Sequence, residues 1–123
     1  MKIKGVLVDI INKRIETREV EDTLEEYYNL LNCDMIEIVS RHIGGKDYDI
    51  ICDEEGLLKV NPIVSAFDSL NQPMLVGNLF IVNYGENGEE ASLTEEDIDH
   101  ILKFGHLIET KNGQTNVAIR VEY

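Results

Sequence analysis

The chain has 123 residues, of which 43% are hydrophobic and only two are prolines. This length is sufficient to bury a core without disulfides or metals, so we expect one domain over residues 1–123. The 24 acidic residues outnumber the 11 basic ones and give a formal net charge of -13. That charge disfavours nonspecific binding to nucleic acid or to an anionic membrane, and it attracts partners with a basic surface.

The two cysteines, Cys33 and Cys52, form neither a CxxC motif nor a metal-ligand spacing. We expect two buried, reduced thiols, as in a cytosolic protein. The apolar run within MKIKGVLVDI is too short to cross a membrane, and we recognise no signal peptide or lipidation signal. The sequence therefore predicts a cytoplasmic protein.

The N-terminal part of the sequence predicts a β-hairpin. Residues 3–11 form a strand-like run, and Asn12 with Lys13 provides a tight turn. The alternating charges of residues 14–20 suit a strand at the edge of a sheet.

An amphipathic helix is predicted next. Asp22 is expected to cap its first turn, with Glu25 at the reciprocal capping-box position, and Asn32 to end it in the left-handed conformation. The residues of its expected buried face are Leu24, Tyr27, Tyr28 and Leu31.

The central stretch predicts a second hairpin, because Gly44 and Gly45 separate two strand-like runs, Met35–Ile43 and Asp47–Cys52. Placing Ile43 opposite Lys46 fixes the register of the other pairs. The expected partners are Arg41 with Tyr48, Val39 with Ile50, Glu37 with Cys52, His42 with Asp47, and Ser40 with Asp49.

A third run, Met74–Val82, is the most apolar in the chain and predicts a central strand that is covered on both faces. Before it we expect a short extended piece at residues 57–60 and an irregular segment at residues 61–73. After it we expect a loop at residues 83–91, with Asn87–Gly88 as its turn.

The last third predicts a second amphipathic helix with a capping box of Ser92 and Glu95 and an end at Gly105. Its expected buried residues are Leu93, Ile98, Ile101, Leu102 and Phe104. A final hairpin is expected from residues 106–110 and 115–123. These elements predict an α+β protein with a mainly antiparallel β-sheet of about six strands and two amphipathic α-helices.

Catalytic motifs are absent from the sequence: it has no GxSxG elbow, P-loop, dinucleotide fingerprint, HExxH or EF-hand loop. The three histidines are scattered, and the acidic turn Asp53–Glu55 is typical of a solvated turn more than of a cation site. We therefore expect no enzyme activity, no cofactor and no metal site.

Basic residues are scarce, which makes their positions informative. Arg18, Arg41 and Arg120 are candidates for a pocket that binds a phosphorylated ligand, because arginine offers phosphate a planar fork. The alternative is that they are exposed residues on a very acidic surface. Phe67, Phe80, Phe104 and the tyrosines are candidates for stacking on a base, although the pattern of Phe80 and Phe104 favours a place in the core.

Five segments resemble a group of small phage and prophage proteins. In that group an acidic EEG turn, an NP segment, a glycine-containing strand and an SLT helix start occur in this order. The matching segments, which lie between Glu21 and Ile101, are EDTLEEYYNLLNCDMIEIV, IGGKDYDIICDEEGLL, NPIVSA, QPMLVGNLFIV and ASLTEEDIDHI. Within the group the chain is most similar to the Thoeris anti-defence protein 1 family.

The resemblance implies a sponge, a protein that sequesters a signal without cleaving it. The implied ligand is a cyclic ADP-ribose isomer made by bacterial TIR proteins, and some relatives also take up cyclic oligonucleotides. It further implies a homodimer, or a hexamer built from dimers, in the cytoplasm of an infected bacterial host. Phe80 is the implied base-stacking residue, residues 83–91 a pocket wall with Asn83 and Asn87, and Ser92 the start of the SLT helix.

One further residue follows from the same comparison. His106 stands where a basic residue is expected just after the second helix, and Phe104, already a candidate from the aromatic pattern, lies two residues before it. The other interpretation of the sequence is an acidic phage protein that mimics DNA or docks on a basic host protein.

Overall fold

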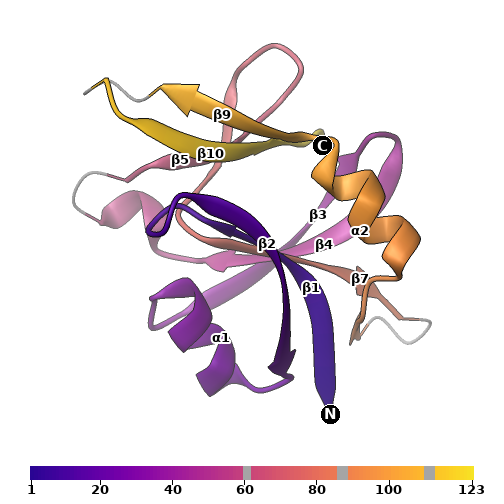
Figure 1. Cartoon of the computed structure of the whole chain (residues 1–123). Coiled ribbons are helices and arrows are strands. Elements are labelled where there is room, and N and C mark those ends of the chain that lie inside the picture. The colour runs from indigo at the N-terminus through magenta and orange to yellow at the C-terminus, as the bar shows by residue number, and fades with distance from the viewer. Residues whose placement is uncertain (60–61, 86–88, 110–112) are drawn as a thin grey trace.

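The computed structural model describes residues 1–59, 62–85, 89–109 and 113–123. These residues form ten β-strands, two α-helices and one 3-10 helix, η1 (Figure 1). In chain order the elements are β1 (Lys2–Asp9), β2 (Arg14–Glu21), α1 (Leu24–Leu31), β3 (Ile36–Ile43), β4 (Lys46–Asp53), η1 (Gly56–Leu58), β5 (Val64–Phe67), β6 (Pro73–Val76), β7 (Leu79–Tyr84), β8 (Glu90–Ala91), α2 (Glu95–Leu102), β9 (Gly105–Glu109) and β10 (Thr115–Arg120).

The described strands form two sheets. Sheet A has six strands, in the order β2-β1-β7-β4-β3, with β8 paired to the end of β7. Sheet B has the order β6-β5-β10-β9, and its β5–β10 pair is parallel, whereas the other pairs in both sheets are antiparallel. The predicted α+β class with a mainly antiparallel sheet and two helices is thereby confirmed. Sheet B as a separate layer was not predicted.

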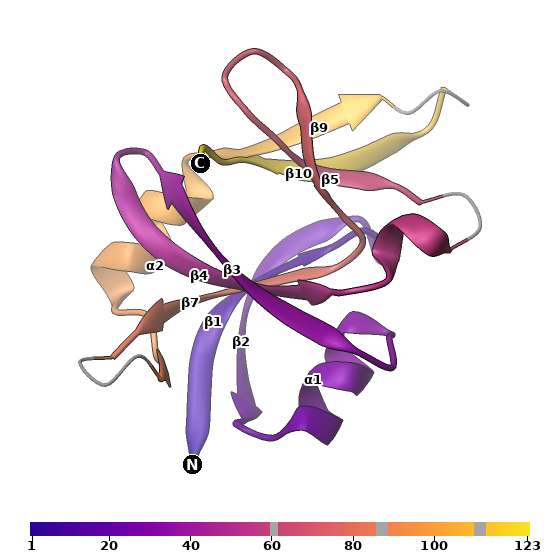
Figure 2. The same ribbon diagram turned by 180° about the vertical axis from the view of Figure 1, so that it is seen from behind.

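Each face of sheet A packs against its own hydrophobic core. One core joins Leu7, Phe80 and Val82 of the sheet to Tyr27 and Leu31 of α1. The other core lies on the opposite face of sheet A, which sheet B and α2 cover together (Figure 1). Turning the molecule by 180° shows the tip of the β3–β4 hairpin in front of α2 (Figure 2).

The β3–β4 hairpin has the predicted register at every pair, from Ile43 opposite Lys46 to Glu37 opposite Cys52. Gly44 and Gly45 have φ values of +56° and +85°, which only glycine adopts without strain. The first hairpin is also confirmed: β1 pairs with β2 along its length, and β2 is an edge strand of sheet A.

The apolar run Met74–Val82 was predicted to be one strand. It forms parts of two strands, β6 and β7, which lie in different sheets. β7 lies at the centre of sheet A, and its residues 79–82 are completely buried, which confirms a central strand covered on both faces. Gly77 and Asn78 separate the two strands. The φ of Gly77 is +77°, and Asn78 Oδ1 accepts a hydrogen bond of 2.9 Å from Ile10 N. Residues 73–76 form β6 in sheet B instead.

The helices begin one and two residues later than predicted. Thr23, not Asp22, caps α1, because its Oγ1 accepts from Glu26 N. For α2 the capping box is Thr94 with Asp97, not Ser92 with Glu95.

The helix ends and buried faces differ in part from the prediction. Asn32 is left-handed at the end of α1, as predicted. The second helix ends earlier, with Lys103 as its C-cap, and Gly105 begins β9. Leu24 and Leu102 are exposed, and they are the first residue of α1 and the last residue of α2.

Two segments differ from the prediction: residues 61–73, expected to be irregular, and residues 57–60, expected to be extended. Residues 61–73 contain β5, which pairs with the last strand of the chain, and residues 56–58 form η1 in place of an extended piece. The final strand pairs with both β5 and β9, and His42 and Glu122 exchange two backbone hydrogen bonds of 2.8 Å. These bonds hold the C-terminus against the tip of the β3–β4 hairpin.

Candidate functional site

A cavity of about 260 Å³ on sheet B brings together two of the predicted site residues, His106 and Arg120. We call it the Arg120 pocket. Its lining residues are Phe67, Asn71, His106, Ile108, Glu109, Ala118, Ile119 and Arg120. They come from β5, β9, β10 and the loop that joins β5 to β6, which projects beyond β9 and β10 (Figures 1 and 2).

Strand pairing explains why these residues meet. Ala118 of β10 is opposite His106 of β9, and Arg120 is opposite Phe67 of β5. Side chains two residues apart on a strand share a face, so Ala118 and Arg120 point to the same side of sheet B. The register therefore places the imidazole of His106, the ring of Phe67 and the guanidinium group of Arg120 around one cavity.

The guanidinium group of Arg120 is held by two hydrogen bonds to the β5–β6 loop. Its Nη1 donates to the backbone carbonyl of Asp68 at 3.0 Å, and its Nη2 donates to Asn71 Oδ1 at 3.2 Å. Asp68 in turn accepts from Leu70 N and Gln72 N through Oδ1, which fixes the loop. Arg120 forms no ion pair with the described residues. Its charge is therefore oriented but not neutralised by a carboxylate.

Asn83 and Ser92 lie close to each other but outside the Arg120 pocket. Asn83 Nδ2 donates to Asp97 Oδ2 at 2.8 Å, and Ser92 Oγ accepts from the backbone of Lys4 at 2.9 Å. Both bonds tie the start of α2 to sheet A, which is a structural role. The predicted site residue Asn87 and the predicted turn Asn87–Gly88 lie outside the described residues.

The two predicted stacking residues of the sponge interpretation do not line the Arg120 pocket, although the backbone carbonyl of Phe104 accepts a hydrogen bond of 2.9 Å from Arg120 N. Phe80 is completely buried beneath α1, where its ring centre lies 6.2 Å from that of Tyr27. It therefore offers no exposed face to a base. Phe104 is half-buried and packs against His100, with ring centres 5.4 Å apart, at the tip of the β3–β4 hairpin.

The other predicted arginines also lie outside the Arg120 pocket. Arg18 is on the edge strand β2 and pairs with Glu16 at 3.0 Å. Arg41 lies on β3, where its guanidinium carbon is 4.8 Å from the centre of the Tyr123 ring and Nη1 donates to Ser40 O. Of the candidate cations, the structure brings only Arg120 and His106 into one cavity.

A family model described as a domain of unknown function, DUF3846, matches residues 2–106. The chain belongs to the DUF3846 family. No curated protein and no solved structure matches it. The matched range covers sheet A, both helices and the start of β9, whereas Arg120 lies beyond it.

Sequence reasoning missed the loop residues that orient Arg120 in this DUF3846 chain. The segment 61–73 was expected to be irregular, but nothing singled out Asn71. Its φ of +61° lies in the left-handed region, which asparagine tolerates better than other non-glycine residues. An asparagine in a Pro- and Gln-containing loop is the only available signal, and it does not reveal a partner that lies 49 residues away.

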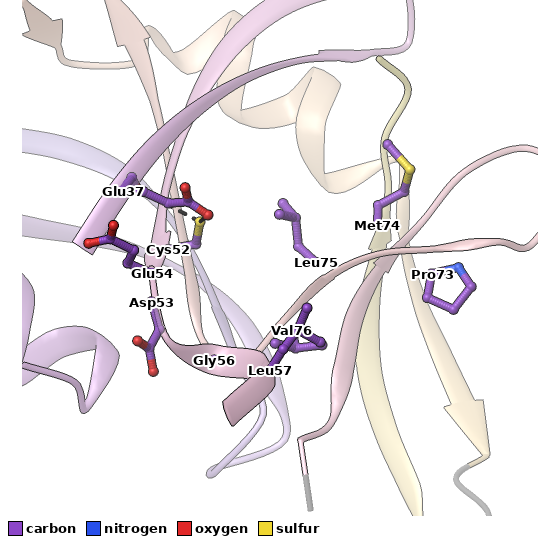
Figure 3. Close-up of a pocket in the computed structure, with 10 residues that line it drawn as sticks. All are labelled: Glu37, Cys52, Asp53, Glu54, Gly56, Leu57, Pro73, Met74, Leu75 and Val76. Carbon is purple, nitrogen blue, oxygen red and sulfur yellow. Dashed lines mark hydrogen bonds between the residues drawn. The ribbon is translucent and has the colours of Figure 1, made fainter. Parts of the chain in front are cut away.

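A second cavity, of about 200 Å³, lies where the end of the β3–β4 hairpin faces β6 (Figure 3). We call it the Glu37 pocket. Its lining residues are Glu37, Cys52, Asp53, Glu54, Gly56, Leu57, Pro73, Met74, Leu75 and Val76. Burial, and then the charge of Glu37, raise the pKa of the Cys52 thiol to about 12, so this cysteine stays protonated and is not a nucleophile at neutral pH.

Two kinds of feature are not found among the described residues. Within residues 1–59, 62–85, 89–109 and 113–123, no group of three or more His, Cys, Asp or Glu side chains is placed to hold a metal ion. Neither described α-helix is long and apolar enough to cross a membrane.

Proposed function

We propose that this chain is a sponge that binds a cyclic ADP-ribose isomer of the kind made by bacterial TIR proteins, and sequesters it without cleavage. The resemblance of residues 21–101 to the Thoeris anti-defence protein 1 family suggests the ligand class. The structural observation that supports it is the oriented guanidinium of Arg120 in a cavity that also contains an aromatic ring.

The lining of the Arg120 pocket suits a nucleotide with a pyrophosphate. Arg120 already uses Nη1 and Nη2 once each for the loop, and a guanidinium group has five N–H donors. The remaining donors are available to phosphate oxygens, with His106 on the neighbouring strand as a second donor. Phe67 offers a half-buried ring, and Ile108 an apolar surface, for a base or ribose.

One chain supplies only part of the enclosure. Ligand pockets typically measure about 300–1,000 Å³, whereas the Arg120 pocket measures about 260 Å³. A sponge must release its ligand slowly, which requires a more closed site. We therefore expect a second subunit to cover the ligand, in a homodimer or a hexamer of dimers.

Thermal unfolding and native mass spectrometry with and without cyclic ADP-ribose isomers and cyclic oligonucleotides test this function. A ligand that binds only the folded state raises the melting temperature, and native mass gives ligands per oligomer. Heating the complex and separating the released compound by chromatography should return it unaltered. An altered product would mean that the protein is an enzyme, and no shift with any of these nucleotides would rule out the sponge.

Two arginine variants separate a specific site from general charge. Arg120→Ala should abolish the ligand-induced shift, because it removes the only oriented arginine of the pocket. Arg14→Ala is the matched control: this residue is exposed on β2 and pairs with Glu16 at 3.2 Å, outside the pocket. An equal loss in both variants would indicate nonspecific attraction of the ligand to positive charge.

A second candidate function is supported by the net charge of -13. An acidic protein of this kind can dock on a basic host protein or mimic DNA. It predicts salt-sensitive binding to a DNA-binding host protein that duplex DNA competes away, and no stabilisation by nucleotides.

A further inference from the structure

The Glu37 pocket differs from the Arg120 pocket in both position and charge. It lies between the end of the β3–β4 hairpin in sheet A and β6 in sheet B, and it shares no lining residue with the Arg120 pocket. Figure 3 shows carboxylates on the hairpin side and the side chains of Met74, Leu75 and Val76 on the β6 side. The cavity thus has one acidic wall and one apolar wall.

The charges of its carboxylates are not equivalent. Asp53 is neutralised by Lys59, whose Nζ lies 2.8 Å from Asp53 Oδ2. Glu37 and Glu54 form no ion pair with the described residues, and none of the ten lining residues is basic. A small anion is therefore disfavoured here, and a cation is favoured.

Glu37 is the carboxylate that faces the cavity. It lies opposite Cys52 in the strand register, and the thiol donates to its Oε1 at 3.9 Å and to its backbone carbonyl at 3.7 Å. Figure 3 shows its carboxylate turned towards Leu75, whereas the carboxylate of Glu54 points away from the cavity. A bound cation would therefore contact Glu37 directly and experience Glu54 only through its field.

The apolar wall on β6 lies close to η1 at Gly56. A Cβ on Gly56 would lie 2.7 Å from Val76 Cγ2, so glycine allows η1 to approach β6 closely beneath the pocket. Leu75 and Val76 are half-buried, so part of each side chain remains accessible in the pocket. A short aliphatic chain that lies on them would bury apolar surface on both partners.

We propose that the Glu37 pocket binds a primary ammonium group on a short aliphatic stem, with the ammonium at Glu37 and the stem against Leu75 and Val76. This site is independent of the nucleotide site and does not require the sponge function. Free alkylamines and the side chain of a lysine on a protein share this chemistry.

Nuclear magnetic resonance with small probes tests the site directly. n-Pentylammonium should shift the backbone and methyl resonances of residues 74–76 saturably. 1-Pentanol, which has the same stem without charge, should bind at least threefold more weakly, and pentanoate should give no saturable shift. Lysine blocked at both its amino and carboxyl ends tests the second source, and saturation at lower concentration than for pentylammonium would indicate a protein-borne lysine.

Three glutamate variants distinguish direct contact from overall charge. Glu37→Gln should weaken pentylammonium about three- to fivefold, the size expected for one exposed ion pair. Glu54→Gln removes the same charge from the same pocket but should change affinity less than twofold. Glu19→Gln, on exposed edge strand β2, should have no effect.

All three substitutions are at exposed residues, so the folded spectrum should be preserved. Equal binding of pentanol and pentylammonium, equal effects of Glu37→Gln and Glu19→Gln, or no saturable shift of residues 74–76 would each overturn the proposal.

Discussion

The Tyr48 hydroxyl donates a hydrogen bond of 3.0 Å to Asp97 Oδ1, which joins β4 of sheet A to the first turn of α2. The other carboxylate oxygen of Asp97 accepts from Thr94 N at 3.1 Å and from Asn83 Nδ2 at 2.8 Å. One carboxylate therefore caps a helix and fixes it to the sheet. Two sequence-predicted site residues, Asn83 and Ser92, belong to this structural junction.

We expect Asp97→Asn to lower the free energy of unfolding by about 1–2 kcal/mol at pH 7, because it weakens the helix cap and the bonds from Tyr48 and Asn83. Burial raises the pKa of Asp97, but the hydrogen bonds from Thr94, Asn83 and Tyr48 outweigh burial and hold it below 3.8. The contribution of the ionised carboxylate is therefore fully present above pH 3.8 and is lost as the pH falls through the lower folded pKa.

Urea unfolding from pH 7 to pH 3 measures this effect. The difference between wild type and Asp97→Asn should shrink at the acidic end. Asp99→Asn is the control, since Asp99 is exposed on the same helix, and it should cost less than about 0.5 kcal/mol. A constant difference across the range would show that the charge of Asp97 does not contribute.

The two turn glycines of the β3–β4 hairpin provide a second prediction. Both have positive φ, so alanine at either position costs about 1–2 kcal/mol. A Cβ at Gly45 has no heavy atom within 4 Å, whereas a Cβ at Gly44 would overlap the Phe104 ring and lie 2.7 Å from His100 Cε1. Gly44→Ala should therefore destabilise the fold by about 1–3 kcal/mol more than Gly45→Ala, measured by chemical unfolding. Equal costs would indicate that Phe104 moves aside freely.

The buried position of Phe80 leads to a third prediction. Phe80→Leu should lower stability by about 1–2 kcal/mol, because it leaves a gap beneath α1. It should retain the full ligand-induced thermal shift, unlike Arg120→Ala. A folded Phe80→Leu protein that has lost the shift would restore the role in base stacking that the family resemblance implies.

The local elements were predictable because short-range chemistry specifies them. The glycine pair fixed the register of the β3–β4 hairpin, and Asn32 ended α1 as expected. The alternation of charge identified β2 as an edge strand. Each of these depends on residues that are close together in the chain.

The second sheet and the Arg120 pocket were not predictable in the same way. The apolar pattern of residues 74–82 is the same whether they form one strand or two. The positive φ of Gly77 changes the direction of the chain between residues 73–76, which pair in sheet B, and β7 in sheet A. Parallel pairing of β5 with β10 then brings Phe67 beside Arg120. Contacts between such distant segments leave no periodic signal in a single sequence.

The bond from Arg120 to Asn71 gives the last prediction, which depends on the proposed nucleotide site. Asn71→Gly keeps the left-handed backbone accessible but removes the Oδ1 acceptor, so the guanidinium loses one of its two anchors. We expect about 1 kcal/mol weaker ligand binding, roughly fivefold. Isothermal titration with the cyclic ADP-ribose isomer measures it.

Asn32→Gly is the matched control, because Asn32 has the same left-handed conformation at the end of α1, outside the pocket. It should leave affinity unchanged. If Asn71→Gly binds as tightly as Asn32→Gly, the Asp68 carbonyl alone is sufficient to orient Arg120.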